Sequence, residues 1–351
     1  MILAKERPTK KKVIFSAKEA GSAALIAAIA KDMNLTVDSV CFISKVAEPY
    51  FENLNMIKYI CDDNLIPSDV NFEFILRTVD VVIMGASAGF SIEKQIYNRC
   101  INKKIPIYAF IDHYWNLWQR FAAADTAVKW AYLPDRIYVM DKVLRERIIT
   151  QGAPRSRVKV FNNPLLNLKN ICASNREKKA ARKILNIGEK TTVVLFVSEY
   201  GFIPSTQWQW DQPPESDITA LLLILVRSIE ALVSEQKQSV LLLIKKHPSD
   251  THEWAIASQK PFCRVIDTCA KDVLFGSVDI AFGLNSMMLL EASKCGVPSY
   301  SFHKNGYVRE TSLSGLREEV TEIIDESECH EKIIDVIKSR SKDYGQDNNL
   351  Y

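Results

Sequence analysis

The chain has 351 residues, of which 47% are hydrophobic and 25% charged, and its formal net charge at pH 7 is +3. This length exceeds one ordinary hydrophobic core and predicts roughly two domains. The composition excludes a disordered chain, and the small net charge argues against a protein that binds nucleic acid.

Strand and helix patterns alternate along the first half, in which apolar runs are separated by amphipathic segments. Strands are expected at 11–17, 39–44, 56–61, 79–87, 105–112, 136–140 and 158–164, and helices at 22–33 and 91–103. Parallel strands need long crossover connections, so this alternation predicts an α/β lobe with a parallel sheet.

The second half repeats the pattern after a polar, helix-forming stretch at 175–187. Strands are expected at 191–201, 239–248, 262–267, 279–284 and 297–302, and helices at 217–235 and 286–296. The sequence therefore predicts two α/β lobes with a cleft between them, where ligands commonly bind. We expect a first domain at 1–165, a linker at 166–190 and a second domain at 191–351.

Apolar runs, cysteine and histidine spacing, and a basic segment indicate the cell compartment in which the protein is expected to work. No run of 18 uncharged apolar residues predicts a membrane-spanning helix. The eight cysteines form no CxxC pair and the five histidines no HxH or HxxxH pair, so we expect free thiols in a reducing cytoplasm and no metal site. The basic segment at 5–12, KERPTKKK, is interpreted either as a solvated start or as a peripheral contact with an anionic membrane surface.

In the second half, polar side chains follow apolar strands. The stretch LLLIKKHPSD delivers Lys245, Lys246 and His247 to a strand end, because Pro248 cannot continue a central strand. The ends of parallel strands bind ligands in open α/β sheets, although a solvated basic turn would look the same.

A second group of polar residues surrounds the helix expected at 286–296. Asn285 and Ser286 precede this helix as caps or as part of a phosphate site. Glu291 lies inside the helix, either solvated or bonded to a ribose.

The order KKHP followed by NSMMLLEASKCGVP resembles the donor domain of GT-B glycosyltransferases, and KxHP resembles the HP motif of bacterial sialyltransferases, Kdo transferases and glycerophosphotransferases. This resemblance implies two Rossmann-like lobes of the GT-B type. It places His247 with Lys245 or Lys246 on a donor phosphate, Asn285 and Ser286 opposite them, and Glu291 on the ribose.

The first half should then hold the acceptor and a base for its hydroxyl proton. AFIDHYWNLWQRF, at 109–121, places Asp112 and His113 at a strand end. Asp112 is the expected catalytic base, either directly or by orienting His113 for that role. Trp115 and Arg120 follow as acceptor-side candidates, with the ring suited to stacking on a sugar. The alternative is a Trp-rich core segment with a capping aspartate. The pair CDDN at 61–64 lacks the glycine of the acidic sialyltransferase motif.

Two small-residue turns complete the acceptor side. KEAGS contains Glu19 and Gly21, and GASAGFSIE contains Ser87 and Glu93. The glycines admit substrate close to the backbone or permit a tight turn, and the two glutamates are further base candidates.

The function expected from these features and the resemblance is that of a cytoplasmic glycosyltransferase. It would use a nucleotide sugar, with a CMP-activated acidic sugar as the preferred donor, and no other cofactor. A glycan or lipid-linked glycan acceptor would be extended in bacterial surface polysaccharide synthesis (capsule or lipopolysaccharide), without a metal. Alternatives are a nucleotide-sugar 2-epimerase or hydrolase on the same fold, or a nucleotide-binding protein without catalysis.

Overall fold

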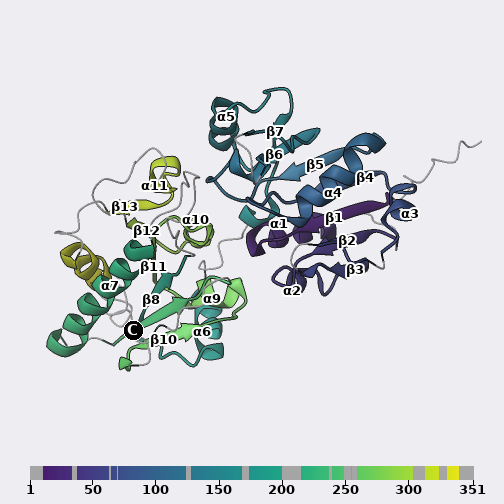
Figure 1. Ribbon diagram of the computed structural model, residues 1–351. Helices are drawn as coiled ribbons and strands as arrows, with labels where there is room; N and C mark the ends of the chain where they lie inside the picture. The colour runs from purple at the N-terminus through teal and green to yellow at the C-terminus, as the bar shows by residue number, and fades with distance from the viewer. Residues whose placement is uncertain are drawn as a thin grey trace, which may run out of the picture. The chain divides into compact units, whose positions relative to one another are not determined.

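The computed structural model of the chain divides into two compact units, Met1–Asn167 and Leu168–Tyr351 (Figure 1). The residues that it describes are 11–33, 38–62, 65–68, 70–123, 128–167, 174–199, 215–236, 239–248, 254, 259–302, 313–323 and 330–339. Most of the basic segment 5–12 lies outside them.

The first unit contains a seven-stranded, entirely parallel sheet in the order β3-β2-β1-β4-β5-β6-β7. Its strands are β1 (Val13–Ala17), β2 (Val40–Ile43), β3 (Ile57–Ile60), β4 (Val81–Met84), β5 (Ile107–Phe110), β6 (Arg136–Val139) and β7 (Val158–Val160). Its α-helices are α1 (Ala20–Asp32), α2 (Glu48–Phe51), α3 (Phe72–Leu76), α4 (Ile92–Cys100) and α5 (Lys142–Thr150).

The second unit has a six-stranded parallel sheet in the order β10-β9-β8-β11-β12-β13. The strands are β8 (Thr192–Val197), β9 (Val240–Lys245), β10 (Cys263–Ile266), β11 (Ile280–Gly283), β12 (Ser299–Phe302) and β13 (Thr321–Ile323). The helices are α6 (Asn175–Ile184), α7 (Glu215–Gln236), α9 (Lys271–Ser277), α10 (Met287–Lys294), α11 (Leu313–Leu316) and a last helix at 330–339.

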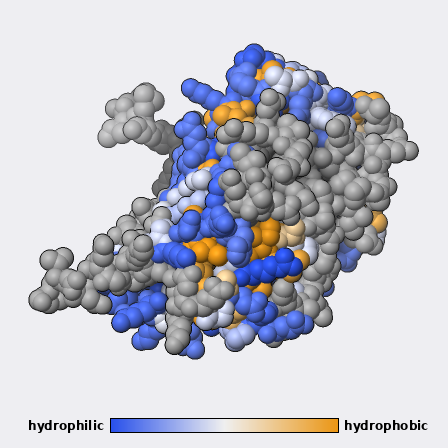
Figure 2. Space-filling model, turned by 90° about the vertical axis from the view of Figure 1, so that its left-hand side faces the viewer, coloured by the Kyte–Doolittle hydropathy of each residue, from blue (hydrophilic) through white to orange (hydrophobic). Residues whose placement is uncertain are grey.

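The two separate parallel sheets confirm the predicted α/β class and the two Rossmann-like lobes. Every residue of β1 and of β8 is buried, which explains why these strands are continuous apolar runs in the sequence. In the second unit the core joins α7 to the last helix, through Ile229 and Ile333. On the face seen in Figure 2, hydrophilic residues lie beside a group of hydrophobic ones near the centre.

The expected linker at 166–190 is corrected by helix α6, which belongs to the second unit. Arg182 of α6 and Asp279 before β11 are each 3% exposed, and Arg182 Nη2 lies 2.6 Å from Asp279 Oδ2. Lys178 Nζ contacts the other oxygen of Asp279 at 2.6 Å. The polar, helix-forming stretch that suggested a junction is therefore a helix of the second unit, held by a buried ion pair.

The expectations about free thiols and membrane-spanning helices can be compared with the described residues. Cys41, Cys61, Cys100, Cys263, Cys269 and Cys295 are free thiols, and the other two cysteines lie outside the described part. Within that part, no helix is both long and apolar enough to cross a membrane.

Candidate functional site

The site in the first unit lies where the strand order reverses, between β1 and β4, at the carboxyl ends of these strands. Open α/β sheets bind ligands at such a switch point. Glu19 and Gly21 follow β1, and Ser87 and Glu93 follow β4. The parallel topology therefore brings together two loops that are about seventy residues apart in the sequence.

Glu93 fastens these two loops to each other. Its side chain is 2% exposed, and Oε1 accepts hydrogen bonds from Lys18 N at 3.0 Å and Ser87 Oγ at 2.9 Å. Lys18 Nζ in turn donates to the carbonyl of Phe90 at 2.8 Å. We conclude that Glu93, a candidate base in the sequence, holds the frame of the site.

Arg120 occupies the centre of the cluster and is 7% exposed. Its Nη1 donates to the carbonyl of Ala86 and lies 3.4 Å from Asp112 Oδ1 and 3.9 Å from Glu19 Oε2. One guanidinium thus connects the loops after β1, β4 and β5. Of the eight residues proposed for the first unit, Glu19, Gly21, Ser87, Glu93, Asp112 and Arg120 share this cluster.

Glu19 and Asp112 differ in their access to solvent. The side chain of Glu19 is 46% exposed and that of Asp112 is 11% exposed. Desolvation of its carboxyl group raises the pKa of Glu19 from 4.5 to about 7 against the pull of Arg120, and the negative charges of Asp112 and Glu93 add to the rise. Glu19 is therefore placed to exchange protons near neutral pH.

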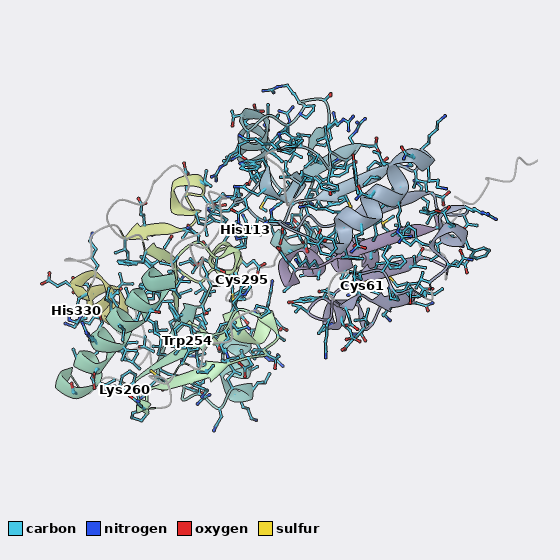
Figure 3. The ribbon with its side chains drawn as sticks, in the orientation of Figure 1. Cys61, His113, Trp254, Lys260, Cys295 and His330 are labelled. Atoms are coloured by element: carbon cyan, nitrogen blue, oxygen red, sulfur yellow. The ribbon has the colours of Figure 1, made fainter. Side chains whose placement is uncertain are left out.

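The aromatic residues after β5 are packed differently from what the sequence suggested. Trp115 is 1% exposed and Tyr114 is fully buried, with the two ring centroids 5.9 Å apart. The ring of His113, labelled in Figure 3, lies 4.1 Å from that of Trp115. The expectation that Trp115 stacks on a sugar is therefore wrong, because its ring belongs to the core.

Gly21 permits the close approach of α1 to Asp112. A Cβ added at Gly21 would lie 2.3 Å from Asp112 Oδ2, so that the carboxylate would have to turn away from Arg120. Gly21→Ala should therefore lower turnover by up to about 10²-fold through misplacement of the cluster. Its effect on stability should stay small, because alanine gains about 1 kcal/mol of helix propensity over glycine.

The Gly21→Ala prediction is checked by kcat/KM and by thermal unfolding. Lys31→Ala, an exposed change near the end of the same helix, is the control. Unchanged turnover in a folded Gly21→Ala protein would contradict the role given to this contact.

The second unit has its own switch point, between β8 and β11. Glu199 follows β8, and its Oε1 accepts hydrogen bonds from Leu284 N at 3.2 Å and Asn285 N at 2.6 Å. Sequence reasoning missed Glu199, although it follows an apolar strand in the same way as the residues that were selected. Burial raises the pKa of Glu199 to about 7 even though backbone N–H donors oppose the rise.

The residues predicted to bind phosphate lie at the carboxyl edge of the second sheet, close to its switch point. Lys245 ends β9, which is adjacent to β8. Its Nζ donates to the carbonyls of Lys246 and Asp267 at 2.9 and 2.8 Å, and burial lowers its pKa. Lys245 thus ties β9 to β10.

The residues around α10 have structural partners in addition to their predicted roles. Ser286 Oγ caps the helix by accepting from Met288 N at 3.3 Å, and Asn285 Oδ1 accepts from Leu313 N at 2.9 Å. Glu291 is 8% exposed and its Oε2 lies 2.5 Å from Lys271 Nζ of α9. A ribose at Glu291 would therefore have to share this carboxylate with Lys271.

No group of three or more metal-ligating side chains occurs among the described residues. The candidate sites are therefore built from carboxylates, cationic side chains and backbone N–H groups.

Comparisons with known proteins identify the fold. No family model and no curated protein matches the chain. Among solved structures, the Anabaena protein HepE in complex with UDP-glucose is similar over 95% of this chain and 90% of its own, with a TM-score of 0.62 and 12% identity. UDP-GlcNAc 2-epimerase from Methanocaldococcus jannaschii, in complex with UDP-GlcNAc and UDP, covers 93% and 92% with a TM-score of 0.58 and 11% identity.

The epimerase from Neisseria meningitidis, bound to UDP-GlcNAc, is similar over 93% of this chain and 90% of its own, with a TM-score of 0.58 and 13% identity. These likenesses do not point to the sialyltransferase and Kdo transferase group in particular. At such low identity they establish the architecture, and the chain has the GT-B-type fold of two Rossmann-like units.

Proposed function

We propose that the chain is a glycosyltransferase that acts on a nucleotide-activated sugar. The observation that carries this proposal is the cluster at the switch point of the first unit. There Glu19, whose side chain is 46% exposed and whose pKa is raised to about 7, lies with its Oε2 3.9 Å from Arg120 Nη1, and the same nitrogen lies 3.4 Å from Asp112 Oδ1. A general base works best when its pKa lies near the working pH.

In the proposed reaction a Glu19 carboxylate oxygen takes the proton of an acceptor hydroxyl. The hydroxyl oxygen forms a bond to the anomeric carbon of the sugar, and the bond between that carbon and the phosphate oxygen breaks, so that the electron pair leaves with the nucleotide. Asp112 and Arg120 act as positioning residues for Glu19. We assign His113 to the support of the loop after β5.

The second unit is proposed to hold the nucleotide. Lys246 and His247 would stabilise the charge that develops on the leaving phosphate, and Ser286 would present the start of α10 to it. These groups lie at the carboxyl ends of β9 and β11, beside the switch point. Glu291 is the proposed ligand of the ribose.

The donor proposed first is a UDP-sugar, because the similar solved structures contain UDP-glucose or UDP-GlcNAc. This choice replaces the CMP-activated acidic sugar favoured by the sequence. The acceptor is proposed to be a glycan hydroxyl, and the protein to work in the cytoplasm.

A 2-epimerase is the second candidate, favoured by the presence of two carboxylates, those of Glu19 and Asp112, beside Arg120. Inversion at carbon 2 requires that a C–H bond breaks and re-forms, so that one group must remove a proton and another must return it. Glu19 and Asp112 are close enough to the same guanidinium to serve such a pair of steps.

Both candidates are tested by incubating the protein with UDP-glucose, UDP-GlcNAc or a CMP-activated acidic sugar in D2O, with and without glycan acceptors. A glycosyltransferase should release nucleotide in proportion to the acceptor. An epimerase should incorporate deuterium at carbon 2 without acceptor. Nucleotide binding without either reaction would contradict an enzyme and favour a nucleotide-binding protein.

A further inference from the structure

The loop between β4 and α4 carries an exposed aromatic ring at the edge of the sheet where the first cluster lies. Phe90 is 54% exposed, although the next residue, Ser91, is fully buried. Trp115, by contrast, is enclosed in the core. A Cβ added at Gly89 would meet no atom of the described residues within 4 Å, so that part of the chain leaves room beside this turn.

The backbone that carries Phe90 is held at three consecutive positions. Lys94 Nζ donates to the carbonyl of Gly89 at 2.6 Å, and Lys18 Nζ donates to the carbonyl of Phe90 at 2.8 Å. Ser91 Oγ accepts from Lys94 N at 3.4 Å and caps α4. A ring on such a fixed backbone loses little freedom when a ligand covers it, so its position is preorganised for binding.

Lys94 is an unusual anchor because its charge is buried. The residue is 6% exposed, and its ammonium group lies 5.5 Å from the centroid of the Tyr132 ring in addition to its bond with Gly89. Burial of an ammonium group is unfavourable, and desolvation lowers the pKa of Lys94 from 10.5 to about 8. The position of Phe90 is thus maintained by a contact that a freely solvated turn does not require.

Lys18 connects this ring to the proposed base. Its backbone N–H donates to Glu93 Oε1 at 3.0 Å, its Nζ holds the carbonyl of Phe90, and Glu19 follows it directly in the chain. Glu19, which is 46% exposed, and Phe90 therefore reach solvent from two loops that are bonded to each other. An apolar ring near a carboxyl group suits an amphipathic ligand, and a pyranose has C–H groups on its faces and hydroxyl groups at its edge.

We propose that Phe90 is the platform on which the acceptor sugar stacks, with a hydroxyl group of that sugar directed to Glu19. The inference rests on the proposed function and adds the class of acceptor, a pyranose with an uninterrupted C–H face. In β-glucopyranosides and β-galactopyranosides, the hydrogens of carbons 1, 3 and 5 are axial on one face, which carries no axial oxygen. An α-mannopyranoside has an axial oxygen on each face and should be disfavoured.

Two probes, methyl β-D-glucopyranoside and methyl α-D-mannopyranoside, test this proposal by saturation-transfer NMR on the full chain. The wild-type protein should bind the glucoside about tenfold more tightly, the factor expected when roughly 60 Å² of apolar surface leaves water. Saturation should be strongest at the hydrogens of carbons 1, 3 and 5. Phe90→Ala should bind the glucoside about tenfold more weakly and lose the preference, whereas Phe90→Tyr, which keeps the ring, should retain both.

The control is Phe74→Ala, which removes a ring that is 62% exposed on α3 of the same unit. This variant should bind both glycosides as the wild-type protein does. Equal binding of the glucoside by the wild-type protein and Phe90→Ala would overturn the inference, as would equal binding of the two glycosides by the wild-type protein. So would an equal loss in Phe74→Ala, because the effect would then not belong to this loop.

Calorimetry with UDP-glucose separates the platform from the proposed function. Phe90→Ala should bind UDP-glucose as the wild-type protein does, and a loss of that affinity would assign the ring to the donor and overturn its role for the acceptor. Glucoside binding that depends on Phe90, without any binding of UDP-glucose, would support the platform and contradict the proposed substrate. UDP-glucose binding without Phe90-dependent glucoside binding would leave the proposed function standing and remove the platform. Binding of neither probe class would overturn both.

Discussion

Glu19→Gln should lower the rate of sugar transfer by about 10²–10⁴-fold, the usual contribution of a general base. The amide has nearly the same shape but cannot take a proton at neutral pH. In the wild-type protein, kcat/KM should rise with pH and level off above about 7, because the ionised form of Glu19 is the active one. In Glu19→Gln, kcat/KM should be low and should not rise with pH.

The pH dependence of stability offers a second measurement on the same residue. The pKa of Glu19 is raised in the folded protein, so the folded chain binds more protons than the unfolded chain between pH 4.5 and about 7. Stability linked to Glu19 is therefore lost as the pH rises through this window, and Glu19→Gln should lessen that loss. Glu52→Gln, an exposed change after α2, serves as the control. A Glu19→Gln protein with full turnover would exclude Glu19 as the base.

Asp279→Ala should destabilise the protein by about 3–5 kcal/mol, the cost typical of removing one partner from a buried ion pair. Arg182 is 3% exposed, so its buried positive charge would lose the Asp279 carboxylate beside it. Val193 N, which donates to Asp279 Oδ2 at 2.8 Å, would lose its acceptor as well. Urea unfolding measures the change.

The control for Asp279→Ala is Glu189→Ala, which removes the partner of Lys179 on the same helix. Lys179 and Glu189 are 63% and 68% exposed, so this change should cost about 1 kcal/mol or less. If the two variants unfolded at the same urea concentration, the buried pair would not be what holds α6 to the second unit.

The strands were predictable because their signal is local. Runs such as VIFSA and TVVLFV are apolar throughout, and burial on both faces of a parallel sheet requires that composition. Helices α5 and α9 were not predicted, although Asp141 caps α5 by accepting from Leu144 N at 2.8 Å. These helices have only nine and seven residues, so the helical period repeats too few times to be recognised.

The site was predictable only in part. The sequence shows which residues follow a strand, whereas the burial of a side chain depends on residues that are distant in the sequence. Strand ends pointed to Glu19, Asp112 and Arg120, which the structure brings together. The sequence does not show that Trp115 is enclosed, since its neighbours come from the tertiary fold. Glu199 has partners more than eighty residues away, and no spacing in the sequence reveals them.

The strand order also bears on the synthesis of the protein. In each sheet the first strand made is a central one, and its second partner arrives only after two outer strands: β4 follows β2 and β3, and β11 follows β9 and β10. A chain leaving the ribosome therefore carries β1 with one edge unpaired until Val81–Met84 emerge, and β8 until Ile280–Gly283 emerge. Such edges are sites of wrong pairing with other chains. Slow decoding of the codons between β3 and β4, or between β10 and β11, would prolong this vulnerable interval.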